Sequence, residues 1–381
     1  MRVKKLLKFL SIPFVMACSA LSYAETAPIP AQLLLTIYHA PSPMKADNKY
    51  YLVYEIYLTN FMKTESTITS FQIDNDQHKQ LITLNDLKNA IQSRNKDENA
   101  FQFKPGETKT LFIWLPFDKE TDIPKNLVHD VDINSSFQDK NYTFNMGSSM
   151  LKVNQTMPVI IDAPIHGKNW LAGNAPSNTS DHRRTSMVIN GKPYYAQRYA
   201  IDFVQMGKDG KSYTGDVHKN TSYHCYNQDL LAVADGTVVK LQDGIPENIP
   251  NSNKFAVPIT EKALPGNYIV IDIGHGKYAG YAHIIPGSFK VKLGDHVTRN
   301  QVIAKLGNSG NSSEPHLHFQ IINASSFLES DGIPYGFKHF SAHSSELIDE
   351  ANGSLSVKLT DQPFKEFSNQ LVLENALMNF D

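Results

Sequence analysis

Residues 315–321 read Pro-His-Leu-His-Phe-Gln-Ile, a stretch in which polar and apolar side chains alternate. Successive side chains of a strand point to opposite faces, so this alternation predicts a half-buried strand over His316–Ile322. His316 and His318 then share one face, where they can converge on an ion or a substrate group, while Leu317 and Phe319 face a core. Two histidines at this spacing are more often ordinary surface or core residues, so other residues are needed to show whether they belong to a functional site.

Two segments upstream carry further polar residues on apolar strands. Tyr281-Ala282-His283 ends a run that begins at Gly266, and Asp202 interrupts the apolar stretch Arg198–Phe203. A buried carboxylate needs a partner or a metal, because an unpaired charge in a core is costly. An ion pair with Arg198, four residues earlier, is the simpler alternative for Asp202, but it leaves the paired histidines unexplained.

The region from about 157 to about 340 is predicted to be all-β. Asn190-Gly191 and Asp235-Gly236 are hairpin-turn signals. The strands expected here are Tyr195–Val204, Leu230–Leu241, Tyr268–Ile273, Val302–Leu306 and His316–Ile322.

The first part of the chain, from about residue 31 to about 146, also reads as strands. β-branched and aromatic residues dominate Tyr50–Thr59, Thr110–Leu115 follows a Pro-Gly turn, and Leu127–Ile133 partly alternates. Thr83–Ser93 is predicted to be a short helix capped by Thr83 or Asn85. Short strands at this spacing favour an antiparallel β-sandwich, which we expect to be a structural or binding module.

Length and composition agree with two globular domains. The chain has 381 residues, of which 41% are hydrophobic and 19% charged. A formal charge of −2 gives no basic field for nucleic acid, so no nucleic-acid partner is expected. Two cysteines, Cys18 and Cys225, exclude a disulfide scaffold and a multi-cysteine zinc ribbon.

The first 24 residues have the pattern of a secretory signal. Basic residues in Met1–Lys8 precede the apolar run Phe9–Leu21, and Ser22-Tyr23-Ala24 offers small residues for cleavage. We therefore expect export to the periplasm or the medium, and no transmembrane helix in the mature chain. Cleavage would remove four basic residues and no acidic ones, which changes the formal charge from −2 to −6. Lipid anchoring through Cys18 is the minority alternative, because Met16 fits a lipoprotein signal poorly.

Two other nucleophile patterns are incomplete. Residues 307–313 (GNSGNSS) nearly match the serine-hydrolase elbow, but Asn311 replaces its last glycine and no strand-to-helix turn is predicted there. His224-Cys225 could form a thiol–imidazole pair, but no second motif supports it. A serine or cysteine nucleophile is therefore not expected.

Taken in order, the segments around the histidines resemble the lysostaphin-type zinc endopeptidases of the duplicated-hybrid-motif fold. The resemblance covers roughly residues 157–340. It is carried by Ala200–Phe203, Leu231–Val239, Gly266–Asp272, Gly280–His283, Gly294–Ile303, Gly307–Asn311 and His316–Phe319.

The resemblance implies a ligand set and two catalytic histidines. In that family one zinc ion is held by the histidine and aspartate of H-x-x-x-D and by the second histidine of H-x-H. Carried over, Asp202 and His318 are ligands, and His283 and His316 are the catalytic histidines. Three protein ligands leave one zinc position for water, whose proton a neutral histidine can accept.

The sequence departs from the family at Arg198, which stands where the first histidine ligand is expected and cannot ligate because it stays protonated. We predict that His182 replaces it. If Asn190-Gly191 closes a hairpin, a two-residue turn sets His182 opposite Tyr199, whereas a three-residue loop with a bulge at Gly191 sets it opposite Arg198. Only the bulged register brings His182 towards Asp202, unless the strand kinks near Asp181. The alternative is that His182 belongs to a solvated basic loop.

These observations predict a two-domain exported protein, with a signal peptide over 1–24, a β-sandwich over 25–150, a lysostaphin-type domain over 157–342 and a C-terminal extension over 343–381. The expected function is a zinc endopeptidase whose substrate is peptidoglycan or another peptide. The alternative, motivated by Arg198, is an inactive module that binds cell wall or regulates a wall hydrolase.

Overall fold

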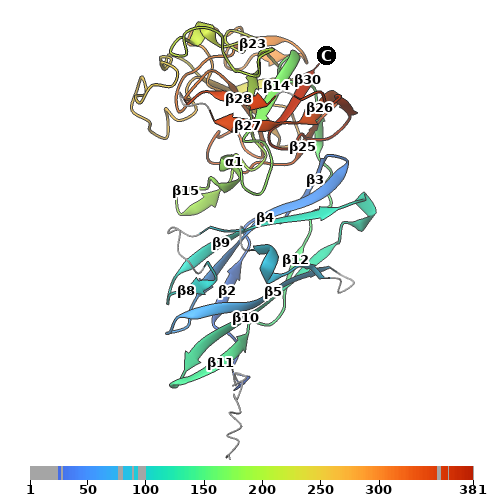
Figure 1. Cartoon of the computed structure of the whole chain (residues 1–381), viewed down its shortest axis with the longest axis vertical. Coiled ribbons are helices and arrows are strands. Elements are labelled where there is room, and N and C mark those ends of the chain that lie inside the picture. The colour runs from blue at the N-terminus through green and yellow to red at the C-terminus, as the bar shows by residue number, and fades with distance from the viewer. Residues whose placement is uncertain are drawn as a thin grey trace, which may run out of the picture.

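The computed structural model describes residues 25–26, 29–75, 80–87, 90–92, 100–349, 353–358 and 360–380. The predicted signal peptide, with Cys18, lies outside these residues. Two bodies of strands lie end to end (Figure 1). The chain passes from one to the other between β12 (Ser149–Lys152) and β13 (Val159–Ile161). The all-β prediction is confirmed.

The N-terminal domain is a sandwich of two sheets, as predicted. One sheet has the order β2-β4-β9-β7 with β3 beside β4. The other has the order β1-β11-β10-β5-β6 with β12 beside β10 and β8 beside β5, and its β1 pairs with β11 in parallel. The first comprises β2 (Leu33–Thr36), β3 (Pro43–Ala46), β4 (Lys49–Asn60), β7 (Ile91–Gln92) and β9 (Thr108–Phe117). The second comprises β1 (Glu25–Thr26), β5 (Ser66–Asn75), β6 (Gln80–Ile82), β8 (Gln102–Phe103), β10 (Asn126–Phe137), β11 (Lys140–Asn145) and β12.

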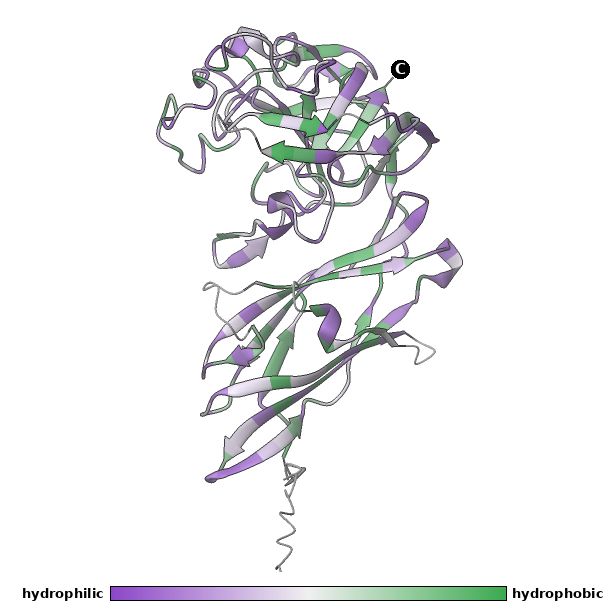
Figure 2. Cartoon of the chain, in the orientation of Figure 1, coloured by the Kyte–Doolittle hydropathy of each residue, from purple (hydrophilic) through white to green (hydrophobic). Residues whose placement is uncertain are grey.

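Alternation along the strands builds the sandwich core. Hydrophobic and hydrophilic residues follow one another along β5 and β10 (Figure 2). Their inward side chains, such as Phe71 and Val131, meet Leu52, Tyr54 and Ile56 from β4 in one buried cluster. β4 does not alternate in the way that β5 and β10 do, because both of its faces are buried.

The predicted helix over Thr83–Ser93 is wrong in the part described. Only Leu84–Leu87 forms a turn, the 3-10 helix η1, and Ile91–Gln92 is strand β7. Pairing of β7 with β9 outweighs the local helical pattern, because a strand that completes a sheet satisfies its backbone there. The other short helical turns are η2 (Glu120–Asp122), η3 (Asn220–Ser222) and α1 (Asp181–Arg184). Among the described residues, no helix has the length and apolar character that a membrane span requires.

The C-terminal domain is organised on a ten-stranded sheet of order β22-β19-β20-β21-β24-β17-β14-β30-β26-β29. Its strands are β14 (Gly167–Gly173), β17 (Ile201–Gln205), β19 (Gly236–Gln242), β20 (Tyr268–Asp272), β21 (Tyr278–Ala282), β22 (His296–Val297), β24 (Leu317–Ile322), β26 (Phe340–Ser344), β29 (Lys365–Phe367) and β30 (Ala376–Phe380). Pairs outside it are β13 with β25 (Tyr335–Phe337), β15 (Met187–Ile189) with β16 (Lys192–Tyr194), β18 (Asp229–Leu231) with β23 (Val302–Lys305), and β27 (Glu346–Asp349) with β28 (Leu355–Lys358).

The segment 343–381, predicted to be an extension, contributes to this sheet. β30 pairs with β14 on one side and with β26 on the other. Met378 and Phe380 join the main buried cluster with Trp170. The segment is therefore a structural part of the C-terminal domain, because β30 completes the sheet between β14 and β26 and its apolar side chains enter the main cluster.

Two strand predictions are interrupted by turns. Tyr195–Val204 is a strand only from Ile201, since residues 196–199 form a turn closed by hydrogen bonds to Tyr195 and Gln197 carbonyls. Leu230–Leu241 divides into β18 and β19. Asp235-Gly236 therefore does not close a hairpin, because β18 pairs with β23 whereas β19 pairs with β20 and β22. The other predicted strands are confirmed.

Candidate metal centre

Three neighbouring strands bring the predicted polar residues together. β17 pairs with β24 so that Asp202 lies directly opposite His318, and β21 pairs with β24 so that Ala282 lies opposite His318. His283 follows β21 with φ of 62°, a left-handed backbone that turns its ring back towards the sheet. His316 directly precedes β24. The site thus lies where three strand ends meet.

Asp202 is the centre of the cluster. One carboxylate oxygen, Oδ1, lies 3.0 Å from Nδ1 of His318 and 3.5 Å from Nε2 of His316. The other, Oδ2, lies 3.2 Å from Nε2 of His182 and accepts a hydrogen bond from Nδ2 of Asn174 at 3.0 Å. Burial alone would raise the pKa of Asp202, but the His182 and His316 charges and its hydrogen bonds hold the pKa well below its usual range. Asp202 is therefore an anion at neutral pH.

His182 reaches Asp202 by a route that differs from the predicted one. β15 and β16 pair in the two-residue register, with Ile189 opposite Lys192, so the bulged turn is wrong. The chain instead kinks at Asp181 into α1, whose first turn Ser180 caps by accepting a hydrogen bond from the Arg183 amide. That helical turn directs His182 towards Asp202. Burial lowers the pKa of His182, but Asp202 outweighs burial and the net pKa lies above its ordinary value.

Arg198 lies away from the cluster. Its guanidinium pairs with Glu55 of β4 and with Asp331, at 2.7 and 3.3 Å. The alternative in which Arg198 neutralises Asp202 is therefore wrong.

His318 is oriented by Gln320, two residues along the same face of β24. Nε2 of His318 donates to Oε1 of Gln320 at 2.9 Å, and the Gln320 amide donates in turn to the Phe327 carbonyl at 2.9 Å. Burial lowers the pKa of His318. A neutral ring with its proton on Nε2 presents the Nδ1 lone pair to Asp202. The period-2 spacing of His316, His318 and Gln320 is the sequence signal for this contact, and Gln320 was not among the residues predicted for the site.

The two predicted catalytic histidines lie side by side, with ring centroids 4.6 Å apart. Nδ1 of His283 donates to the Ser309 carbonyl at 2.7 Å, and Nδ1 of His316 donates to the Glu314 carbonyl at 2.9 Å. Each ring therefore directs Nε2 into the cluster. Burial is the main cause that holds the pKa of His283 well below its ordinary value, and repulsion from His316 and His318 in their protonated forms adds to it. His283 is an unprotonated base at neutral pH.

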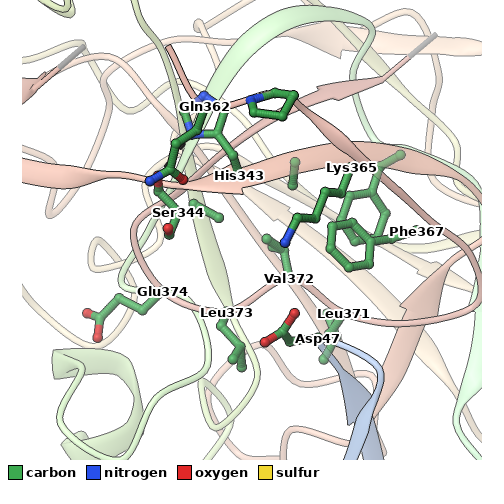
Figure 3. A pocket seen from close by; sticks show the side chains of 14 residues that line it. Asp47, His343, Ser344, Gln362, Lys365, Phe367, Leu371, Val372, Leu373 and Glu374 are labelled. Carbon is green, nitrogen blue, oxygen red and sulfur yellow. Dashed lines mark hydrogen bonds between the residues drawn. The ribbon is translucent and has the colours of Figure 1, made fainter. Parts of the chain in front are cut away.

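The donor atoms of His182, Asp202 and His318 all lie within 4.8 Å of one another, the spacing of a metal site. Cys225 is buried at the Pro315 carbonyl, and burial raises the pKa of its thiol to about 12, so it is not a nucleophile. A cavity of about 550 Å³ lies elsewhere, and Phe340, Phe367, Leu371, Lys365 and Asp47 are among the residues that line it (Figure 3). None of the five predicted site residues lines it.

Comparisons with known proteins agree with this arrangement. Residues 216–329 match the sequence profile of Peptidase family M23, a range that includes His283, His316 and His318. Over 93 residues the chain is 40% identical to the peptidoglycan DD-endopeptidase ShyA of Vibrio cholerae, a segment covering 24% of this chain and 21% of that protein. The chain thus matches about a fifth of the length of this relative.

Similar solved structures include the catalytic domain of the antimicrobial peptidase lysostaphin from Staphylococcus simulans, at 23% identity over 44% of this chain and 88% of that chain, with a TM-score of 0.23. A zinc-containing peptidase from Vibrio cholerae is 15% identical over 57% of this chain and 84% of that chain, with a TM-score of 0.20. Residues 216–329 of the chain therefore match Peptidase family M23, in agreement with the ordered motifs that the sequence shows from Asp202 to His318.

Proposed function

We propose that this protein is an exported, zinc-dependent endopeptidase that hydrolyses peptide bonds in peptidoglycan. The observation that carries the proposal is the convergence of His182, Asp202 and His318 within 4.8 Å, with the rings of His283 and His316 beside them. The match of residues 216–329 to a peptidase family supports peptide-bond hydrolysis. The likeness to a peptidoglycan endopeptidase supports the substrate class.

The donor set fits a zinc ion. Zinc–ligand distances of about 2.0–2.2 Å put neighbouring ligand atoms of a tetrahedron roughly 3.3–3.6 Å apart. The two Asp202–histidine separations of 3.2 and 3.0 Å come close to this. The lone pair on Nδ1 of a neutral His318 faces a carboxylate, which is unfavourable unless a cation lies between them. His182, Asp202 and His318 would therefore hold the ion.

Zinc bound by three protein ligands supplies a Lewis acid and lowers the pKa of water at its open position. The residues of this chain supply the proton transfers. His283 is unprotonated at neutral pH, and because its Nδ1 is committed to the Ser309 carbonyl, Nε2 is the atom at which it can accept a proton. His316, held by the Glu314 carbonyl, directs Nε2 to the same place and can donate a proton to the leaving amine or stabilise the developing oxyanion.

Asn174 and Gln320 would support this centre without contacting substrate. Asn174 donates to Oδ2 of Asp202, the oxygen that also faces His182, and Gln320 fixes the tautomer of His318. Such neighbours of metal ligands typically contribute 10–100-fold to metal affinity. The mature charge of −6 expected from the sequence gives no general attraction to an anionic wall, so substrate recognition would be local.

The test is zinc content and chelator-sensitive cleavage in one preparation. We expect about one equivalent of zinc in the purified mature chain, cleavage of muropeptides or of glycine-rich peptides, and loss of cleavage with a chelator. Asp202→Asn should abolish both, whereas His296→Ala, an exposed histidine on β22, should change neither. Absence of any chelator-sensitive cleavage would overturn the proposal.

The non-catalytic alternative rested on Arg198. Arg198 is paired to Glu55 and cannot supply the missing ligand, whereas His182 lies beside Asp202 and is the candidate for it. Metal content discriminates between the two functions, because a purely binding module has no need of a retained open metal site. Export is tested separately by N-terminal sequencing of the protein recovered outside the cytoplasm, where we expect Glu25 as the first residue.

A further inference from the structure

We propose that Glu55, in the N-terminal domain, is a positioning residue for the metal centre of the C-terminal domain. Its ion pairs with Arg183 and Arg198 fix the positions of the two chain segments that carry His182 and Asp202. The inference rests on the proposed metal site, and it assigns to the N-terminal sandwich a part in forming that site.

Glu55 is the anion at the centre of a buried ion cluster. Its Oε1 accepts hydrogen bonds from Nη1 of Arg183 and, at 3.0 Å, from Nε of Arg198, while Oε2 accepts from Nη2 of Arg198 at 2.7 Å. Exposed fractions are 5% for Glu55, 0% for Arg183 and 6% for Arg198. One carboxylate thus joins two guanidinium groups in a site closed to water.

The first arginine lies next to a candidate ligand. Arg183 follows His182 in α1, and its Nη2 donates to the Tyr54 carbonyl of β4 at 2.9 Å. Its guanidinium stacks 4.7 Å from the Phe112 ring of β9. Figure 1 shows α1 facing β4 and β9. A four-residue helical turn has few internal hydrogen bonds, so its place is set by these contacts with the other domain.

The second arginine precedes the other ligand. Arg198 lies in the turn that leads into β17, and its Nη1 donates to the Gly332 carbonyl at 3.0 Å. Asp331 accepts from Nη2 of Arg198 at 3.3 Å and from the Tyr195 amide at 3.1 Å. This turn sets the direction in which the chain enters β17 and presents Asp202.

The energetics favour a positioning role over a purely stabilising one. A buried ion cluster often contributes no more stability than well-packed apolar residues of similar volume, because desolvation offsets the attraction. Removing one partner is different, since a buried charge is left uncompensated. Without Glu55, Arg183 loses its carboxylate partner and Arg198 keeps only Asp331, so neither guanidinium is held to β4 by a carboxylate. Because metal sites tolerate misplacement of only about 0.5 Å, a small shift of α1 separates His182 from Asp202.

The test compares two buried-charge variants of the full chain. Glu55→Gln keeps the shape and removes the anion. Lys109→Met is the matched control: Lys109 is also buried in the N-terminal domain, but its amino group donates to the Ala100 and Gln102 carbonyls within that domain. We expect Glu55→Gln to weaken zinc affinity by tenfold or more in chelator competition, and Lys109→Met to change it less than twofold.

Two further readouts do not depend on activity. The visible spectrum of the Co²⁺-loaded protein should lose its tetrahedral bands in Glu55→Gln only. In zinc-free protein, backbone amides over residues 178–186 should exchange faster in Glu55→Gln than in the parent and in Lys109→Met. Zinc affinity within twofold of the parent, in a folded Glu55→Gln variant, would overturn the inference.

If Glu55→Gln does not fold, Arg198→Lys serves instead, because it keeps the charge and removes the planar fork. The same weakening of zinc affinity is expected, and unchanged affinity would count against the positioning role. A parent chain without zinc would instead refute the proposed function. Zinc binding and cleavage by the parent, with equal affinity in the variants, would refute only the inference about Glu55.

Discussion

The two histidines of the Pro-His-Leu-His stretch have separate surroundings although both approach Asp202. Nδ1 of His318 faces the carboxylate and Nε2 is committed to Gln320, whereas His316 commits Nδ1 to a carbonyl and stands next to His283. The first arrangement suits a metal ligand and the second suits proton transfer.

His318→Ala and His316→Ala should therefore fail differently. We expect His318→Ala to lower zinc content and the melting temperature of the C-terminal domain, because metal binding and folding are coupled. His316→Ala should keep its zinc while kcat falls by roughly 10²–10⁴-fold. Elemental analysis and muropeptide kinetics on the same preparations measure both. Equal zinc loss in the two variants would show that the assigned roles are wrong.

Residue-level prediction succeeded where the signal was local. Alternation in one strand was enough to place His316 and His318 on one face. The Ser309 carbonyl and the Asn174 amide could not be found that way, because backbone atoms of distant loops carry no residue-type signal and Asn174 lies next to Asp202 only through pairing of β14 with β17.

At the scale of elements, α1 decides where His182 goes. The hairpin β15–β16 has the ordinary two-residue register, which was expected to turn His182 away, and the kink at Asp181 restores the contact. The register could not predict this, since strand geometry ends before residue 182. The Ser180 cap and the adjoining arginines were visible in the sequence, but their partners on β4 and β9 were not.

His182→Ala should lose most of its zinc, as Asp202→Ala should. Removing one of three protein ligands leaves two, which hold zinc weakly at neutral pH. Zinc is measured by elemental analysis after dialysis against a weak chelator, with His296→Ala as the unchanged reference. Undiminished zinc in His182→Ala, together with loss in Asp202→Ala, would exclude His182 as the ligand.

β30 is the element least expected from the sequence, and its contribution can be measured at Met378. This side chain is fully buried, with 0% exposed, and it lies opposite Trp170 of β14. Met378→Ala should lower the free energy of unfolding of the C-terminal domain by about 2–5 kcal/mol, the usual cost of such a cavity. Met150→Ala, at a residue that is 72% exposed, is the control.

Urea unfolding is followed by Trp170 fluorescence in a Trp114→Phe background, so that only the C-terminal domain reports. A change below 0.5 kcal/mol, roughly the range of surface substitutions, would indicate that β30 contributes little.

At the scale of the whole molecule, β4 belongs to both domains. Leu52, Tyr54 and Ile56 enter the sandwich core, whereas Tyr51 and Val53 enter the main cluster of the C-terminal domain. This double burial explains why Tyr50–Thr59 reads as a continuous apolar run rather than as an alternation. The sequence therefore predicted this strand and the folds of both domains. It could not predict that the second face of β4 packs against the C-terminal domain.

The junction should weaken in acid. The Arg198 and Arg183 charges outweigh the effect of burial and lower the pKa of Glu55 to about 2, from an ordinary value of 4.5. A carboxyl with a lowered folded pKa stabilises fully above its unfolded pKa, and this contribution, on the order of 3 kcal/mol, is lost as pH falls from about 4.5 towards about 2. The stability difference between the zinc-free parent and Glu55→Gln should shrink over that range in urea titrations. A stability difference between the two proteins that stays constant with pH would contradict this prediction.

The position of β30 also has a consequence for how the protein is made. β14 pairs with a strand that follows it by some two hundred residues and that comes after every other strand of the sheet. Until residues 376–380 have been synthesised, β14 and β26 have no neighbour on these edges, and unpaired edges invite association between chains. The growing chain is thus kept from closing its sheet early. If the protein is exported as proposed, the delay would favour passage of the unfolded polypeptide through a translocation channel.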